Sequence, residues 1–327
     1  MQQQPLLSVK NLTVQFKTDT GLVKAVDDIS FDIFKGETVG LVGESGCGKS
    51  MTSLALLGLI PKPNGSYGPN SQIVYDGKNL AKYQESEWRT LRGNEFSMIF
   101  QEPMTALNPV FTVKNQMTEV ILRHKAAKNK KAAVDLAIDL LEKVGIPSPE
   151  KRISDYPHQL SGGMRQRVMI AMALAAKPGL LLADEPTTAL DVTTQAQVME
   201  QLSGLQKEMG MTTVLVTHDL GVIAENCQRV MVMYCGKIIE TAPVSDLFSD
   251  PKHPYTKGLL ESIPKIREHR IDVLPTIEGT VPDIKNLPKG CRFADRCHKK
   301  SPECLNAIPP LTQVSDSRQV ACYHPEQ

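Results

Sequence analysis

The sequence predicts an α/β protein: a parallel sheet covered by helices, with an antiparallel β region before it and a small cysteine-bearing module after it. Short apolar runs at 38–42, 180–183 and 213–216 are typical of buried parallel strands, and helical stretches alternate with them. Segments 7–16 and 26–33 alternate apolar and polar residues, as half-buried antiparallel strands do. After about Pro264 the chain is rich in proline and cysteine, which predicts a separate terminal module.

Composition places the chain among ordinary globular proteins. It has 327 residues, 41% hydrophobic and 22% charged, and a formal net charge of +1, which gives no reason to expect a nucleic acid as partner. The N-terminus lacks the pattern of a secretory signal, and the most apolar stretch, 168–183, is interrupted by Lys177 and Pro178. We therefore expect a cytosolic protein without a transmembrane helix, in which the seven cysteines form no disulfide framework.

The segment 43–50, GESGCGKS, fits the phosphate-loop pattern G-x-x-x-x-G-K-[ST] and lies between a predicted strand and a predicted helix. Its glycines allow backbone N–H groups to surround phosphate oxygens at the positive end of the helix. Lys49 would contact the β and γ phosphates, and the Ser50 hydroxyl would bind Mg²⁺. Cys47 is most simply a tolerated small residue, although an exposed thiol there would be sensitive to oxidation. The predicted nucleotide contacts of this region are Gly43, Glu44, Ser45, Gly46, Cys47, Gly48, Lys49, Ser50 and Met51.

Two carboxylates follow the apolar run 180–183. Asp184 and Glu185 are expected at the carboxyl edge of the parallel sheet, where nucleotide sites form. Asp184 would hold Mg²⁺ through water. Glu185 stands one residue further on and can face the γ phosphate, so we predict that it is the general base for the attacking water.

The segment 160–167, LSGGMRQR, begins 24 residues before Asp184 and resembles the signature motif of ABC ATPases. Ser161, Gly162 and Gly163 would open a helix whose N-terminus can bind an anion. The resemblance implies that this anion is the γ phosphate of ATP held by the opposite subunit, so that two ATP molecules are sandwiched between two chains.

The other motifs of that family occur in order. Gln101 matches the Q-loop, 189–191 the D-loop and His218 the switch histidine. The resemblance implies that Gln101 links the metal site to a membrane partner and that His218 contacts the γ phosphate. Phe16 matches the aromatic residue that stacks on adenine, but it could equally be core packing. The implied catalytic residues are Glu185, His218 and Gln101, and the implied Mg²⁺ ligands are Ser50, Gln101 and Asp184.

More narrowly, the chain resembles the ATPases of dipeptide and oligopeptide importers, a family shared with nickel and glutathione uptake. The segments 101–109, 156–158, 184–191 and 253–256 carry this resemblance. It implies an ABC ATPase domain over 6–265, with a helical subdomain at about 100–175, and a C-terminal module over 266–327. It also implies a second, different ATPase subunit, two membrane permeases and an extracytoplasmic binding protein, with this chain at the cytoplasmic face of the membrane. The remaining alternatives are nickel or glutathione uptake and a regulatory ATPase that senses metal or redox state.

Four cysteines lie in the last 37 residues, at 291, 297, 304 and 322. Four thiolates suit either tetrahedral zinc or an iron–sulfur cluster, and four unrelated buried thiols are the simpler alternative. The tail of the resembled importers is associated with a [4Fe–4S] cluster, which favours a cluster with a structural role. If the metal were zinc, His298 or His324 could replace one cysteine as a ligand. The predicted cluster ligands are Cys291, Cys297, Cys304 and Cys322.

Overall fold

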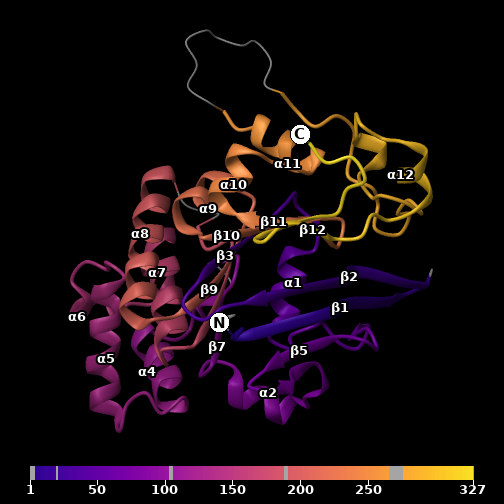
Figure 1. Cartoon of the computed structure of the whole chain (residues 1–327). Coiled ribbons are helices and arrows are strands. Elements are labelled where there is room, and N and C mark those ends of the chain that lie inside the picture. The colour runs from indigo at the N-terminus through magenta and orange to yellow at the C-terminus, as the bar shows by residue number, and fades with distance from the viewer. Residues whose placement is uncertain (1–3, 20, 103–105, 188–190, 265–274, 327) are drawn as a thin grey trace. The chain divides into compact units, whose positions relative to one another are not determined.

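The computed structural model describes residues 4–19, 21–102, 106–187, 191–264 and 275–326, and of Val192 only the backbone (Figure 1). The chain forms two compact units. The first comprises Met1–Ile33, Val39–Lys82 and Thr217–Gln327, and the second comprises Phe34–Thr38 and Tyr83–Val216. Among the described residues, no helix combines the length and the apolar character that crossing a membrane requires.

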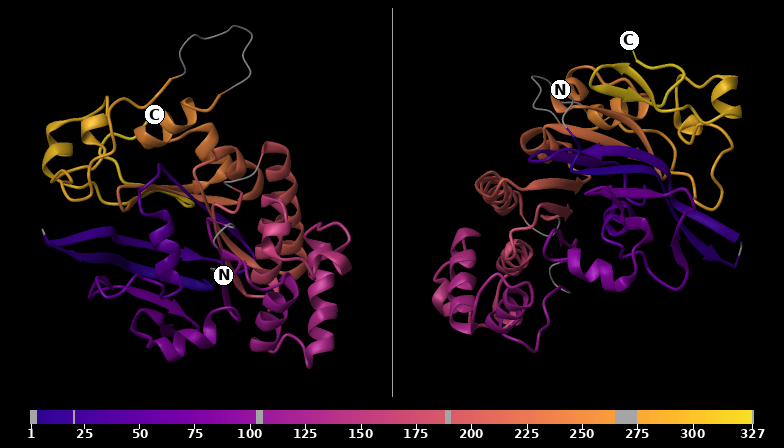
Figure 2. Two further views of the ribbon diagram at one scale, coloured as in Figure 1. Left: turned by 180° about the vertical axis from the view of Figure 1, so that it is seen from behind. Right: turned by 60° about the horizontal axis from the view of Figure 1, so that its bottom comes forward.

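The first unit contains an antiparallel sheet with the strand order β2-β1-β5-β6, and β4 pairs with β1. Its two long strands, seen clearly in both views of Figure 2, bury the side chains of Leu7, Leu12, Val14 and Ile33. The two predicted antiparallel strands are confirmed, but the alternation within the first is interrupted, because the register shifts between Val9 and Gln15 and the residues 12–14 are all buried. The strands are β1 (Leu7–Thr18), β2 (Gly21–Ile33), β4 (Gly65–Tyr67), β5 (Gln72–Tyr75) and β6 (Lys78–Asn79).

A second set of strands in the first unit has the order β12-β13-β11-β10-β3, in which β10 is parallel to β3 and antiparallel to β11. These strands are β3 (Thr38–Val42), β10 (Arg229–Tyr234), β11 (Lys237–Pro243), β12 (Thr312–Ser315) and β13 (Arg318–Val320). The helices of this unit are α1 (Lys49–Leu56), α9 (Leu220–Asn226), α10 (Val244–Ser249), α11 (Pro254–Glu261) and α12 (Pro302–Asn306), with 3₁₀ turns η1 (Leu80–Lys82) and η3 (Ala294–Arg296).

The second unit contains three parallel strands in the order β9-β8-β7. All side chains of β7 (Phe96–Ile99), β8 (Leu180–Asp184) and β9 (Thr212–Thr217) are buried, as expected for parallel strands. Helices α4, α5 and α7 lie beside one another (Figure 1). The helices are α2 (Glu85–Leu91), α4 (Val113–Arg123), α5 (Lys130–Lys143), α6 (Pro149–Arg152), α7 (Gly162–Leu174) and α8 (Val192–Met209), with η2 (Pro157–Gln159).

A buried ion pair joins the C-terminal residues to the sheet of the first unit. The Glu240 side chain is fully buried on β11, and its carboxylate accepts hydrogen bonds from the backbone N–H groups of Lys252 and His253, each at 2.8 Å. Arg318 of β13 donates to the same carboxylate at 2.9 Å. Removing one partner of such a pair would leave a buried charge uncompensated. The interaction therefore fixes β13 beside β11.

The sequence predicted a separate C-terminal module over 266–327 with little core. The structure differs in that this region adds strands to the sheet of the first unit. Its strand β13 pairs antiparallel with β11, so Val320 lies opposite Glu240 and the terminal residues extend the sheet that contains β3, β10 and β11. Short strands such as β13 leave no clear alternation in the sequence. The predicted boundary at 265 and 266 lies outside the described residues, and the domain limits stay predictions.

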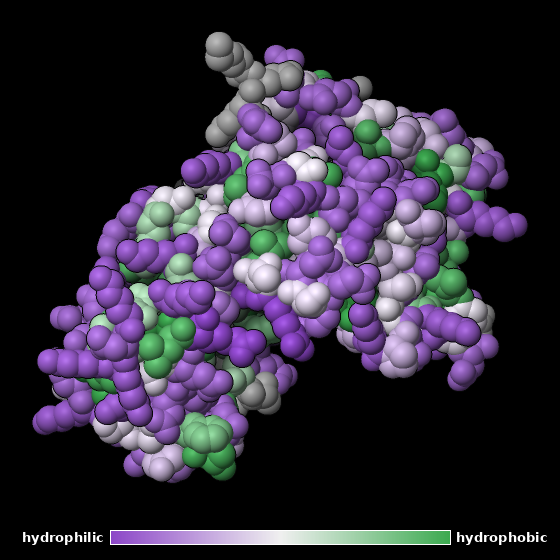
Figure 3. All heavy atoms as spheres, turned by 90° about the horizontal axis from the view of Figure 1, so that it is seen from below, coloured by the Kyte–Doolittle hydropathy of each residue, from purple (hydrophilic) through white to green (hydrophobic). Residues whose placement is uncertain are grey.

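The surface carries few large apolar side chains. On the face drawn in Figure 3, apolar residues occur in small groups among hydrophilic ones. Among the described residues, Phe100, Val110 and Phe111 of the second unit are 43%, 70% and 49% exposed. Their grouping within twelve residues distinguishes this segment from surface side chains exposed one at a time.

Candidate functional site

The predicted phosphate loop lies between β3 and α1 in the first unit. Lys49 is only 5% exposed, and its Nζ donates to the Gly43 carbonyl at 2.7 Å and to the Glu44 carbonyl at 3.1 Å. The loop therefore curves around the ammonium group. Gly48 has φ +110°, and a Cβ there would lie 2.6 Å from the Ala25 carbonyl oxygen, so only glycine fits this position. The loop thus has the geometry of an anion cradle at a helix N-terminus.

The residues around this cradle follow the predicted order. Ser50 lies half-buried in the first turn of α1, and its role as a Mg²⁺ ligand stays a prediction. No acidic residue lies in that first turn, so nothing on the helix itself opposes the positive end of its dipole. Met51 follows on the same helix. Phe16 is half-buried on β1 opposite Val23, and its ring lies against Gly65.

Cys47 is not the exposed thiol that its place in the loop allowed. It is 1% exposed, and burial raises its pKa. A Cβ at Gly43 would lie 2.8 Å from the Cys47 Sγ, so the thiol fills the space beneath the loop. Burial and a raised pKa both disfavour the thiolate that oxidation requires, so the structure supports the interpretation of Cys47 as a small buried residue.

The second unit brings three sequence-predicted residues together at the carboxyl ends of its parallel strands. Asp184 ends β8 and is 3% exposed. The Glu185 N–H donates to the Val216 carbonyl at 2.8 Å, and Gln101 Nε2 donates to Glu185 Oε2 at 2.9 Å. Residues 84 positions apart in sequence therefore share one hydrogen bond at this edge.

Glu185 has a positive φ of +46°. Few residues other than glycine adopt this left-handed conformation, and such strain concentrates at functional sites. This conformation ends β8 at Asp184, so the carboxylates of Asp184 and Glu185 have different neighbours. Asp184 stays in the strand register opposite Val216, whereas Glu185 faces Gln101.

Helix α7 begins at the predicted signature residues. Ser161 is its N-cap, and the Ser161 hydroxyl accepts from the Met164 N–H at 3.3 Å. A Cβ at Gly162 would meet nothing within 4 Å, so this end of the helix is open. Further along, Gln166 donates to the Pro186 carbonyl, which ties α7 to the residue that follows Glu185.

The remaining predicted residues lie near strand or helix ends. His218 is exposed directly after β9, and Asp219 caps α9 by accepting from the Gly221 N–H at 2.8 Å. Asp191 caps α8 by accepting from the Thr194 N–H at 3.0 Å, and this hydrogen bond lowers its pKa. The other two D-loop residues, 189 and 190, lie outside the described residues.

The phosphate loop, Phe16 and His218 belong to the first unit, whereas Gln101, 161–163, Asp184 and Glu185 belong to the second. Their assembly into one nucleotide site stays a prediction.

Two residues that contact the phosphate loop could not be recognised from the sequence. Tyr255 and Arg296 both contact Glu44 from positions more than 200 residues away, and no local pattern marks such a contact.

The four terminal cysteines line one small cavity, together with His253, His324 and Phe293. The Cys291 N–H donates to the Cys304 carbonyl at 2.7 Å. Burial raises the pKa of Cys322 to about 11 and also raises the pKa values of Cys291 and Cys297, which favours the thiol form in the absence of a metal. In the described part of the chain, no three or more His, Cys, Asp or Glu side chains are placed to hold a metal ion.

The two histidines considered as zinc ligands differ in position. His324 lines the cavity, and its Nε2 lies 2.7 Å from the Ser301 hydroxyl. His298 is 64% exposed at its side chain and points to Glu326, with 3.4 Å between Nε2 and Oε1. Among the described residues that line the cavity, two histidines could therefore add a ligand to the four cysteines. They are His324 and the buried His253.

Family models match two parts of the chain. Residues 26–188 match the ABC transporter family, and residues 239–304 match the C-terminal region of oligopeptide/dipeptide transporters. The first match contains the phosphate loop, the signature residues and Glu185. The second contains three of the four terminal cysteines.

Curated relatives match nearly the full length. The chain is 50% identical to the oligopeptide transport ATP-binding protein OppD of Bacillus subtilis (strain 168), over 98% of this chain and 90% of the relative. It is 52% identical to AppD and 49% identical to the dipeptide transport protein DppD of the same organism, over 97% and 98% of this chain and 96% and 95% of the relatives.

Solved structures show the same fold. The ATP-binding cassette MJ0796, in a dimeric post-hydrolysis state bound to ADP and Pi, matches with a TM-score of 0.64 and 28% identity over 73% of this chain and 98% of that one. The cbiO1 protein of Clostridium perfringens matches with a TM-score of 0.62 and 26% identity over 76% of this chain and 92% of that one. The chain therefore belongs to the ABC transporter ATP-binding proteins, as an ATP-hydrolysing subunit of the group that carries the oligopeptide/dipeptide transporter C-terminal region.

Proposed function

We propose that this chain supplies the energy for import of di- or oligopeptides by hydrolysing ATP beneath a membrane-spanning partner. The observation that carries this proposal is its 49–52% identity, over nearly the whole chain, to three peptide-transport ATP-binding proteins. The C-terminal match to oligopeptide/dipeptide transporters supports the same substrate class. Nickel and glutathione remain alternative substrates of the same motor, and a regulatory ATPase is the alternative without transport.

ATP binds at the phosphate loop in this proposal. The backbone N–H groups of 43–50 surround the phosphates, and Lys49, which is already held inside the loop, contacts the β and γ phosphates. Phe16 stacks on the adenine. The oxygen ligands offered by Ser50, Gln101 and Asp184 suit Mg²⁺, which neutralises charge on the phosphates when bound. The strand-end position of the buried Asp184 supports its assignment.

Glu185 accepts the proton of the attacking water in this proposal, and Gln101 positions it. The hydrogen bond from the Gln101 amide orients the Glu185 carboxylate, the group that would accept the proton. His218, exposed at the end of β9, contacts the γ phosphate. The open N-terminus of α7, with Ser161, Gly162 and Gly163, binds the γ phosphate held by the opposite subunit. The opposite subunit is a different ATPase chain in our proposal.

The membrane partner would contact the chain on either side of Gln101. Phe100, Val110 and Phe111 are exposed there, and exposed apolar groups of this kind mark interaction sites. We assign this surface to two permease subunits, with the chain bound peripherally at the cytoplasmic face of the membrane. An extracytoplasmic binding protein would deliver the substrate. Because Gln101 is next to Phe100 in the chain and donates a hydrogen bond to Glu185, permease movement at this segment would reach the catalytic carboxylate.

Substrate-stimulated hydrolysis tests the substrate class. In the transporter reconstituted with its permeases, partner ATPase and binding protein, we expect a mixture of di- and oligopeptides to raise the ATPase rate at least about fivefold, in line with typical coupling between two sites. Nickel and glutathione serve as controls. Stimulation by either control alone would replace peptides as the substrate class, and failure to assemble with any permease would favour the regulatory alternative.

We also propose that Cys291, Cys297, Cys304 and Cys322 bind a [4Fe–4S] cluster, with zinc as the alternative. The support is chemical: four thiols line one cavity that offers no carboxylate. Their raised pKa values describe the metal-free state, and binding would deprotonate them. Since the thiols are not at ligand spacing in this conformation, binding requires rotation of their side chains. The cluster would hold together a proline-rich region of little core and has a structural role in this proposal.

Anaerobic purification of the wild type and Cys304→Ala tests the cluster. We expect about four irons and matching sulfide in the wild type and a broad visible absorption band that the variant loses. Cys227→Ala is the matched control, because Cys227 lies outside the cavity and should leave metal content unchanged. Stoichiometric zinc without iron would contradict the cluster and favour the zinc alternative, and a metal-free wild type would contradict both.

A further inference from the structure

The 291–297 segment, with the sequence CRFADRC, connects the cysteine-lined cavity to the phosphate loop. Its first and last residues, Cys291 and Cys297, line the cavity. Its two arginines point the other way and contact residues around the phosphate loop. All of these residues belong to the first unit. Neither arginine has a role in the ATPase motifs described above.

Arg296 binds the side chain of Glu44, the second residue of the phosphate loop. Its two terminal nitrogens donate to the two carboxylate oxygens at 2.7 and 3.1 Å, a bidentate pair of charge-assisted hydrogen bonds. The Arg296 side chain is 5% exposed and that of Glu44 is 29% exposed, so the pair is partly shielded from solvent. Arg296 also donates to the carbonyls of Ile277 and Glu278, which fixes the guanidinium itself.

Glu44 is therefore held on three sides. Its N–H donates to the Tyr255 hydroxyl at 2.9 Å, its carbonyl accepts from Lys49 at 3.1 Å, and its carboxylate accepts from Arg296. Tyr255 is fully buried, so its hydroxyl is a rigid partner. Lys49 is the predicted phosphate-binding lysine. The position of its acceptor carbonyl thus depends on how Glu44 is held.

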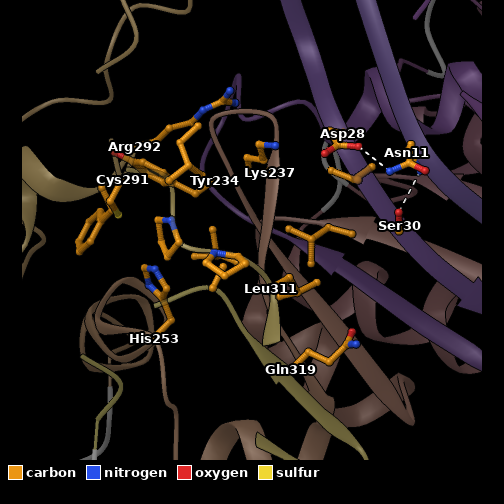
Figure 4. Close-up of a pocket in the computed structure, with 18 residues that line it drawn as sticks. Asn11, Asp28, Ser30, Tyr234, Lys237, His253, Cys291, Arg292, Leu311 and Gln319 are labelled. Atoms are coloured by element: carbon orange, nitrogen blue, oxygen red, sulfur yellow. Dashed lines mark hydrogen bonds between the residues drawn. The ribbon is translucent and has the colours of Figure 1, made fainter. Parts of the chain in front are cut away.

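Arg292 contacts the turn between β10 and β11, which itself contacts the phosphate loop. It donates to Asp27 and to the Cys235 carbonyl. The next residue in that turn, Gly236, donates its N–H to the Cys47 carbonyl of the phosphate loop at 2.7 Å. Figure 4 shows Cys291, Arg292 and Tyr234 together at one side of a cavity of about 500 Å³, across from Asn11, Asp28 and Ser30.

Phe293, between the two arginines, packs the segment onto the same structure. Its ring centroid lies 5.4 Å from that of Tyr234 and 5.5 Å from that of Tyr255, both in edge-on contacts. Aromatic pairs of this geometry add to the free energy of burial. The segment is thus fixed by apolar packing in its middle and by charged hydrogen bonds on either side.

We propose that Arg296 is a positioning residue for ATP binding. It holds Glu44 so that the phosphate loop keeps the conformation that receives the phosphates before ATP arrives. A loop that is already ordered loses less conformational entropy on binding, and its affinity is correspondingly higher. The C-terminal region therefore contributes to ATP affinity through one ion pair. The inference rests on the proposed binding of ATP at this loop but requires no metal in the cavity.

Arg296→Lys in the full-length chain tests the proposal. Lysine keeps the charge but cannot form the bidentate pair, and we expect the Kd for Mg-ATP to rise about tenfold. In steady state, KM for ATP should rise while kcat stays close to the wild-type value, because no reacting atom is touched. Glu44→Gln should have a similar effect, and the double variant should be no weaker than either single variant by more than about twofold.

Arg318→Lys is the matched control. Arg318 is 7% exposed and pairs with Glu240 in the same unit, but it does not touch the phosphate loop. It should lower stability against urea without changing the Kd for ATP. If Arg296→Lys binds ATP like the wild type, or more tightly, the proposal is wrong. It is also wrong if Arg318→Lys weakens ATP binding equally, because the effect would then be one of general stability.

ATP binding by Lys49→Ala shows whether a failure concerns the proposed ATP site or only the role of Arg296. If the wild type and Lys49→Ala bind ATP equally, the phosphate loop is not the binding site and both proposals fail. If Lys49→Ala loses binding while Arg296→Lys retains it, the site is correct and only the positioning role fails.

Discussion

The Glu185→Gln variant is expected to bind ATP but to hydrolyse it at least about 100-fold more slowly than the wild type, the usual minimum contribution of a general base. The amide has nearly the shape of the carboxylate, and its oxygen can still accept the hydrogen bond from Gln101. It cannot take a proton from water at neutral pH. The change therefore removes one chemical property and leaves the packing at the end of β8 intact.

Phosphate release by the purified full-length chain at high concentration, where pairing of chains is favoured, measures this effect. Glu200→Gln, an exposed carboxylate on α8 in the same unit, is the control and should hydrolyse ATP at the wild-type rate. A Glu185→Gln variant with more than about a tenth of wild-type kcat would show that another group accepts the proton.

Lys49→Ala is expected to raise the Kd for ATP at least about 100-fold, or about 2.7 kcal/mol. The ammonium group is almost completely buried and supplies a positive charge that the phosphates would otherwise have to find in water. Its loss also removes the hydrogen bonds that Lys49 donates to the Gly43 and Glu44 carbonyls, so the loop loses the group around which it curves. The two effects act in the same direction.

Titration with ATP, followed by calorimetry, gives this Kd directly. Lys78→Ala, an exposed lysine on β6 of the same unit, should bind ATP as the wild type does. Urea unfolding of both variants should show whether the loop change also lowers stability. An unchanged affinity in Lys49→Ala would mean that the loop binds no phosphate.

Local patterns in the sequence predicted those parts of the site that consist of consecutive residues. Glycines specify the backbone of the phosphate loop, and an apolar run specifies the strand that ends at Asp184. A capping residue specifies the helix that begins after Ser161. The two antiparallel strands at the N-terminus were likewise predictable from their alternation. In each of these cases the residues that determine the structure are neighbours in the chain.

Contacts between distant segments could not be predicted in this way. Arg296 and Glu44 are 252 positions apart, and an arginine between two cysteines carries no sign of its partner. Cys47 appeared able to react because it lies in a glycine-rich loop, but its burial depends on how the loop packs. The pairing of β13 with β11 brings together strands that are separated by most of the C-terminal region. Tertiary packing decided all three.

The nucleotide retained by the full-length chain after incubation with Mg-ATP separates binding at the phosphate loop from hydrolysis at Glu185. We expect Glu185→Gln to retain unhydrolysed ATP, the wild type to release ADP and phosphate, and Lys49→Ala to retain no nucleotide. Retention of ATP by Lys49→Ala, or release of ADP by Glu185→Gln at the wild-type rate, would contradict the assignment of binding to the phosphate loop and of hydrolysis to Glu185.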